Sequence, residues 1–279
     1  MDQAEIKYWV GLSGWKGLGW KKLELLIKHF GSIKRIWLAG PKLNPKWQNK
    51  LGLDKEMEEL GKRLIKVITI EDKRYPKILK EIDSPPFILY VKGKVEELNR
   101  PGLAVVGTRK PTEYGRKAVR QLVPEIAKKL VIVSGLARGI DSLSHWQCLQ
   151  TKGKTVAVLG HGLEQIYPSE NIRLAQEIVH QGGCLVTEYP LNYPMDKVNF
   201  PQRNRIIAGL TLGTLVIEGG QRSGTKITAN MAADYGREVF CVPGPINSEL
   251  SLAPAELIQN GAKLVTKAED IWDELNLNK

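Results

Sequence analysis

Apolar runs of strand length alternate with helical stretches between residues 103 and 242, and this alternation constrains the fold more than any other feature of the sequence. The runs lie at 103–106, 130–133, 155–159, 184–186, 214–217 and 238–242. Strands that are apolar throughout are typical of a sheet covered by helices on both faces. The pattern therefore predicts an α/β fold with a doubly wound, mostly parallel sheet.

The first 65 residues have a different pattern. Apolar residues between Trp20 and Phe30 recur at helical spacing, and Gly31 follows as a helix end. Short strands at 67–70 and 87–91 then extend the later sheet. We expect a small helical domain over residues 1–65 and a Rossmann-like domain over residues 66–279.

The charge of the chain favours a polyanionic partner. The 279 residues carry 41 Lys and Arg against 30 Asp and Glu, a net charge of +11, and residues 1–100 account for +8 of it (21 minus 13). General solubility is the alternative explanation. No apolar run approaches the roughly 20 residues of a membrane span, and the first residues lack a signal pattern. We therefore expect a cytoplasmic protein.

The stretch from Phe200 to Ala229 is rich in arginine and glycine. An apolar strand at 214–217 leads into a turn with Gly219, Gly220 and Gly224, and a helix begins near Thr225. The first amides of a helix and its positive dipole end suit a phosphate. Arginines at 203, 205 and 222 and Lys226 would add positive charge. Alternatively, the glycines only turn the chain and the arginines lie on a solvated face.

Several catalytic and cofactor motifs are missing from the sequence. The first turn after a strand reads Gly107-Thr-Arg-Lys-Pro-Thr112, which lacks the glycines of a dinucleotide-binding fingerprint. The sequence contains no Walker A motif and no GxSxG motif, and its four histidines lack metal-ligand spacing. We expect no cofactor and no metal. Asp141, after the turn at 134–139, is expected to cap the following helix.

Seven motifs occur in the order typical of one known family. They are Val106–Gly115, Ser134–Asp141 with His145, Ile166–Pro168 with Asn171, Glu188–Pro190, Phe200–Gly209, Ser223–Ala229 and Gly236–Gly244. Together they resemble the DNA-processing protein A family, also called DprA or Smf. The resemblance covers most of the chain, although the positions before Leu257 and Ile258 lack the glycine and asparagine usual in the family.

The resemblance implies an extended Rossmann-like domain, an amino-terminal sterile-alpha-motif-like domain and a homodimer. It also implies a non-catalytic function: binding single-stranded DNA during natural transformation and helping to load the recombinase RecA. Many family members continue into a winged-helix domain, which we expect to be absent here. The hairpin Gly17–Lys22 resembles those of helix-hairpin-helix modules, but we favour helix packing over DNA contact for it.

The family pattern places DNA contacts at Arg109 and Lys197, a fork and a point charge that both suit phosphate. Phe200 would stack on a base. The full set of expected DNA-binding residues is Gly107, Thr108, Arg109, Lys197, Phe200, Arg203, Asn204, Arg205, Ser223 and Gly224. Alternatively, Arg203 or Arg205 pairs with a carboxylate such as Glu188 or Glu218, and Phe200 belongs to the core.

Two other function classes stay open at the level of sequence. The turn Glu218–Thr225 resembles that of phosphoribohydrolases, which cleave nucleoside monophosphates on a related fold. Those enzymes need a carboxylate three residues after Gly-Thr, where this chain has Thr228, and a proline that is also missing here. The second alternative is a scaffold that binds only proteins.

Overall fold

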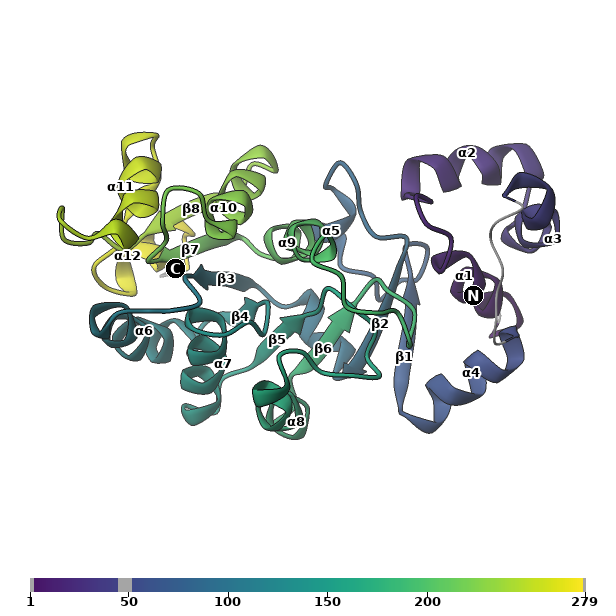
Figure 1. Ribbon diagram of the computed structural model, residues 1–279, viewed down its shortest axis with the longest axis horizontal. Helices are drawn as coiled ribbons and strands as arrows, with labels where there is room; N and C mark the ends of the chain where they lie inside the picture. The colour runs from purple at the N-terminus through teal and green to yellow at the C-terminus, as the bar shows by residue number, and fades with distance from the viewer. Residues whose placement is uncertain (1–2, 45–51, 278–279) are drawn as a thin grey trace.

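The computed structural model describes residues 3–44 and 52–277. Its first helices are α1 (Gln3–Ser13), α2 (Trp20–Phe30), α3 (Ile33–Leu43) and α4 (Leu53–Lys62). They pack together beyond the β1 edge of the sheet, on the right of Figure 1. The change from helices to strands falls between Lys62 and Ile65.

Glycine and serine set the ends of these helices. Gly31 ends α2 with φ of 78°, and its N–H donates to the Ile27 carbonyl. Ser32 then begins α3, because its hydroxyl accepts a hydrogen bond from the Arg35 N–H at 3.3 Å. Trp9 and Trp15 are buried in the core beneath the helices. Trp47, another tryptophan of the region expected to be helical, lies outside the described residues.

The strands of the described residues form one sheet in the order β1-β2-β6-β5-β4-β3-β7-β8-β9. Their bounds are β1 Ile65–Thr69, β2 Ile88–Gly93, β3 Gly102–Gly107, β4 Val131–Ser134, β5 Thr155–Val158, β6 Cys184–Thr187, β7 Gly213–Ile217, β8 Glu238–Cys241 and β9 Lys263–Leu264. Strands β1 and β2 pair antiparallel, as do β2 and β6, and the other pairs are parallel.

The remaining helices cover both faces of the sheet (Figure 1). They are α5 (Lys77–Lys80), α6 (Glu113–Ile126), α7 (Ile140–Gln150), α8 (Ile172–His180), α9 (Asn199–Gly209), α10 (Gly224–Asp234), α11 (Leu252–Gln259) and α12 (Glu269–Glu274). Short 3-10 helices lie at Val95–Asn99, Ser169–Asn171 and Glu249–Ser251. None of the helices in the described ranges is long and apolar enough to cross a membrane.

Strand β3 shows how the two faces are built. Leu103 and Val105 belong to one buried cluster with side chains of α6 and α12, whereas Ala104 and Val106 belong to the other cluster, with side chains of α9 and α10. The doubly wound α/β fold expected from the sequence is confirmed. Because β4 and β7 lie on opposite sides of β3, the turn after β3 is at the point where strand order reverses. Open α/β sheets bind ligands at such points.

Candidate nucleic-acid interface

The turn after β3 is held by the turn after β7. The Thr108 N–H donates to the Glu218 carbonyl at 2.9 Å. The Glu218 carboxylate accepts from the Thr112 N–H at 2.9 Å and from the Thr112 hydroxyl. Gly115 makes room for this carboxylate, since a Cβ there would lie 2.3 Å from Glu218 Oε2. These bonds fix the backbone of residues 108–112, which carries Arg109.

A second turn, between β4 and α7, supports the same segment. The Ile140 N–H donates to the Thr108 carbonyl at 3.1 Å. Gly139 has φ of 79°, and a Cβ there would lie 2.3 Å from the Thr108 carbonyl oxygen. Asp141 does not provide the N-cap of α7, which is Gly139; its carboxylate instead accepts from the Gly135 N–H at 3.1 Å. Hydrogen bonds at Thr108 and at Thr112 therefore hold both ends of the turn after β3.

Arg203 of α9 is buried and joins this turn to β5. Its guanidinium donates to the Gly135 carbonyl at 2.7 Å and to the Val158 carbonyl. Burial lowers the pKa of Arg203 to about 10, and the charge of Asp141 opposes that shift. Burial also raises the pKa of Asp141, against the effect of Arg203. Neither Glu188 nor Glu218 pairs with Arg203, so that alternative is wrong for this residue.

Arg205 points elsewhere. Two residues correspond to about 200° around an α-helix, so Arg205 lies on the opposite side of α9 from Arg203. Its guanidinium forms an ion pair with Glu188 at 2.6 Å, one of the pairings that the sequence left open. Arg205 does not line the cavity beside Arg109. The structure therefore does not bring Arg205 to the cavity beside Arg109.

A small cavity of about 40 Å³ opens beside Arg109. The Arg109 guanidinium lies 5.9 Å from the centre of the Phe200 ring, which lies 6.0 Å from that of Tyr167. Arg109 is exposed, Phe200 is half-buried and Tyr167 is 41% exposed. The lining residues are Arg109, Gly135, Ala137, Arg138, Tyr167, Pro168, Phe200 and Arg203. Phe200 is thus a wall of this cavity and is not enclosed in the core.

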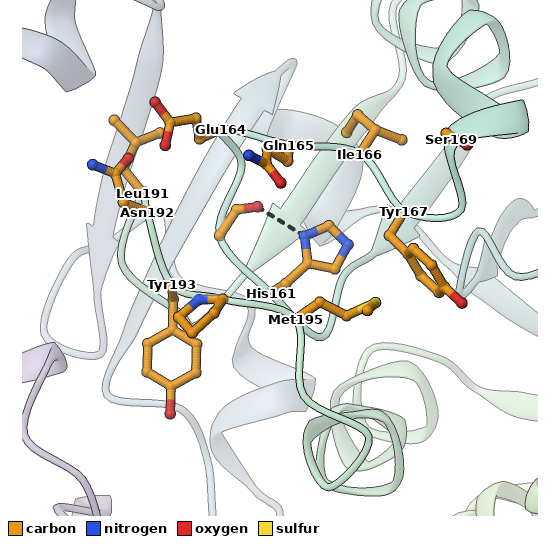
Figure 2. Close-up of a pocket in the computed structure, with 12 residues that line it drawn as sticks. His161, Glu164, Gln165, Ile166, Tyr167, Ser169, Leu191, Asn192, Tyr193 and Met195 are labelled. Atoms are coloured by element: carbon orange, nitrogen blue, oxygen red, sulfur yellow. Dashed lines mark hydrogen bonds between the residues drawn. The ribbon is translucent and has the colours of Figure 1, made fainter.

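Tyr167 also lines a larger cavity of about 400 Å³ (Figure 2). Figure 2 shows His161 near its centre, with Tyr167, Tyr193 and Met195 around it. The lining residues are His161, Gly162, Glu164, Gln165, Ile166, Tyr167, Ser169, Leu191, Asn192, Tyr193, Pro194 and Met195. Burial lowers the pKa of His161, so its ring is neutral at pH 7. Its Nδ1–H then donates to the Gly162 carbonyl at 2.8 Å.

Two loops build this larger cavity, one after β5 and one after β6. The Gly162 N–H donates to the Tyr193 carbonyl at 3.0 Å, and the Glu164 N–H donates to the Leu191 carbonyl at 3.2 Å. A Cβ at Gly162 would lie 2.0 Å from the Leu191 carbonyl oxygen, so only glycine allows this approach. The sequence marks both loops as polar turns after strands. It did not single out Tyr167, His161 or Tyr193 as site residues.

Comparison with known proteins decides the family. The model of the family described as DNA recombination-mediator protein A matches residues 66–276. This chain belongs to that family. It is 39% identical to the DNA processing protein DprA of Bacillus subtilis, over 90% of each chain. It is 37% identical to the protein Smf of Synechocystis, over 99% of this chain and 74% of the relative.

Solved structures of the family share the fold. The DprA structure from Streptococcus pneumoniae has a TM-score of 0.73 and 38% identity, covering 85% of this chain and 90% of that one. The structure from Helicobacter pylori has a TM-score of 0.68 and 29% identity, covering 76% and 97%. A single-stranded DNA binding mode has been described for the Helicobacter pylori protein. The resemblance inferred from the seven motifs is confirmed, and the protein is a DNA recombination mediator of this family.

The other expected site residues are not among those that line the two cavities. Lys197 is exposed before α9 and has no ion pair with any described residue. Gly107 ends β3, and the Thr108 hydroxyl accepts from the Lys110 N–H at 3.2 Å. At the start of α10, the Asn204 amide lies 3.5 Å from the Gly224 carbonyl. Ser223 precedes that helix, and its buried hydroxyl has no hydrogen-bond partner among the described residues.

The turn after β7 does not match the catalytic pattern of the phosphoribohydrolases. Thr228 occupies the position of their carboxylate, is buried, and donates to the Gly224 carbonyl at 3.3 Å. The Glu218 carboxylate is bonded to Thr112. Lys226 is also occupied, because its ammonium lies 2.7 Å from Glu256. In the described part of the chain, no cluster of three or more His, Cys, Asp or Glu side chains could hold a metal ion.

Proposed function

We propose that this protein binds single-stranded DNA in the two cavities that share Tyr167 as a lining residue, protects the strand and helps to load RecA onto it during natural transformation. One observation carries the proposal: an exposed guanidinium, that of Arg109, lies beside the Phe200 and Tyr167 rings at the carboxyl ends of the strands. A cation next to aromatic rings is the combination that sequence-tolerant single-strand sites use.

The phosphates would bind Arg109 and Lys197. Both side chains are exposed, and neither has an ion pair within the described residues. The backbone under Arg109 is held by Glu218 and Ile140, so the guanidinium is positioned before DNA arrives. Preorganisation of this kind lowers the entropic cost of binding. Gly107 and Thr108 lie in the same turn, and the Thr108 N–H is bonded to the Glu218 carbonyl, so these two residues would hold the backbone that carries Arg109.

The bases would enter the cavities. Phe200 and Tyr167 provide stacking faces, each contributing about 1–3 kcal/mol per base. The larger cavity, at about 400 Å³, has the volume to hold a base. The exposed amide side chains of Gln165 and Asn192, which line this cavity, would offer hydrogen bonds to base edges without adding charge. We propose that this cavity holds a base next to the one stacked on Phe200.

The other expected residues take supporting roles in this proposal. Arg203 holds the floor of the smaller cavity, and Arg205 holds the loop before α9 through Glu188. Asn204, Ser223 and Gly224 shape the contact between α9 and α10. We further propose that the protein has no catalytic activity of its own, works in the cytoplasm as a homodimer, and has a separate helical domain over residues 1–65. A dimer would bring two pockets to one strand and raise avidity.

The test is a fluorescence-anisotropy titration of labelled oligo-dT with the wild type and with the Arg109→Ala/Lys197→Ala variant. We expect the variant to lose most of the affinity and the salt slope to fall by about 0.7 per lost phosphate contact. The matched control is Lys128→Ala/Lys152→Ala, which removes the same charge from the turns that lead into β4 and β5, at the amino ends of those strands. Equal binding by wild type and the pocket variant would overturn the assignment.

A further inference from the structure

The helices at the amino end carry a concentration of positive charge that the pocket does not use. Between residues 14 and 43 the chain has seven lysine and arginine residues but only one carboxylate, that of Glu24. All seven are exposed. We call this set the amino-terminal basic cluster: Lys16, Lys21, Lys22, Lys28, Lys34, Arg35 and Lys42.

The helices place these charges in two rows. Lys21 and Lys28 are seven residues apart and therefore lie on one side of α2; Lys34 and Lys42 are eight apart on one side of α3. Within residues 3–44 and 52–277, Lys28 alone of the cluster has a carboxylate within 4 Å, that of Glu24 at 3.8 Å. The charges of the cluster are thus available to an external anion.

Among residues 3–44, the tryptophans close to the cluster do not offer open stacking faces. Trp15 is buried beneath the Lys22 ammonium, which lies 5.7 Å from its ring. Trp20 and Trp37 are partly buried and pack against the core. A site for single strands combines cations with aromatic platforms. Duplex DNA pairs its bases inside and presents about one phosphate charge per 1.7 Å of axis, so a surface of cations without platforms fits the duplex.

The cluster is separate from the pocket. Helices α2 and α3 lie beyond the β1 edge of the sheet, whereas α9 lies over its middle (Figure 1). Helix packing is the role that the sequence favours for Gly17–Lys22. Because Lys21 and Lys22 are exposed, we propose instead that the amino-terminal basic cluster binds the phosphate backbone of duplex DNA, as a second site that works independently of the single-strand pocket. With both sites filled, the protein would hold a single strand next to a duplex.

The test compares a labelled blunt duplex of about 20 base pairs with labelled oligo-dT in anisotropy titrations over a range of salt. The variant is Lys21→Gln/Lys22→Gln/Lys28→Gln, because glutamine has nearly the helix propensity of lysine. We expect duplex affinity to fall about tenfold or more, and the salt slope for the duplex to fall by about 2–3, since each phosphate contact contributes about 0.9. Oligo-dT affinity should stay within twofold of wild type.

Two control variants separate the effect of the cluster on duplex binding from the effects of total charge and of the pocket. Lys128→Gln/Lys152→Gln/Lys267→Gln removes the same charge elsewhere and should change duplex affinity less than twofold. Arg109→Ala/Lys197→Ala should keep duplex binding; if it also keeps oligo-dT binding, the pocket proposal fails while the duplex result stands. Circular dichroism melts confirm that each variant folds.

Wild-type duplex affinity in the cluster variant, or a loss no larger than that of the charge control, would overturn the proposal. Leu25 and Leu38, 65% and 66% exposed among these lysines, would then point to an acidic protein as the partner of this surface.

Discussion

The guanidinium of Arg203 donates to the carbonyl of Gly135 at 2.7 Å, and this bond joins the helix that carries Phe200 to the turn that supports Arg109. The Gly135 N–H in turn donates to Asp141. A buried cation and a buried carboxylate thus act on the same glycine from opposite sides. The two halves of the candidate site, cation and aromatic ring, are held in one rigid arrangement.

Replacing Arg203 should therefore act on stability first. Arg203→Met nearly keeps the volume but leaves the carbonyls of Gly135 and Val158 without their donor, and an unpaired buried polar group costs about 1–3 kcal/mol. Urea denaturation measures this loss. Arg109→Met is the matched control and should unfold like the wild type, because Arg109 is exposed. A variant at 203 that loses DNA binding with unchanged stability would instead show that Arg203 contacts DNA directly.

Gly139→Ala should displace the Arg109 turn. The backbone there has φ of 79°, and the new methyl would lie 2.3 Å from the Thr108 carbonyl oxygen. We expect a loss of stability of about 1–3 kcal/mol together with weaker oligo-dT binding. Gly61→Ala is the control, since Gly61 lies in α4 with open space around it, and alanine favours a helix. Wild-type binding by Gly139→Ala would contradict the proposed coupling of the two turns.

His145 should make the protein less stable in acid. The Thr155 hydroxyl donates to the Ile132 carbonyl, so it accepts from the Nδ1–H of a neutral His145 at 2.7 Å. Burial lowers the pKa of His145 from 6.5 to about 3. The stability that this neutral ring contributes is complete above pH 6.5 and is lost as the pH falls toward 3, by up to about 1.4 kcal/mol per pH unit.

Urea denaturation at pH 7, 6 and 5 measures this dependence. His145→Asn removes the titrating ring and should flatten the stability profile in this range. His180→Asn should keep the wild-type profile, because His180 is exposed. If the profile of His145→Asn ran parallel to that of the wild type, His145 would not be the group responsible.

The two aromatic walls should matter separately. Phe200→Ala and Tyr167→Ala should each weaken oligo-dT binding by about 1–3 kcal/mol, the contribution of one stacked base. Phe200→Tyr keeps the ring and should bind like the wild type. If Phe200→Ala and Phe200→Tyr bind equally well, Phe200 does not stack on a base. The measurement is the anisotropy titration at one fixed salt concentration.

Sequence patterns predicted the strands of the sheet and the position of Arg109 after β3. The order of the motifs indicated the family. Sequence patterns did not separate Arg203 from Arg205, because that distinction depends on the rotation of α9: two residues of helix turn one arginine into the core and the other toward Glu188. Sequence patterns also do not predict the larger cavity. Its loops meet only because β5 and β6 are neighbours in the sheet, and the adjacency of strands is a property of the folded chain.

The location of the bound strand is the central claim, and photo-crosslinking tests it most directly. Oligo-dT with 5-bromouracil at single positions is irradiated with the wild-type protein, and the crosslinked peptides are mapped by mass spectrometry. We predict crosslinks to Phe200 and Tyr167, and to the loop at 191–195, all abolished by Arg109→Ala/Lys197→Ala. Crosslinks confined to the helices before residue 65, or unchanged in that variant, would contradict the proposed site.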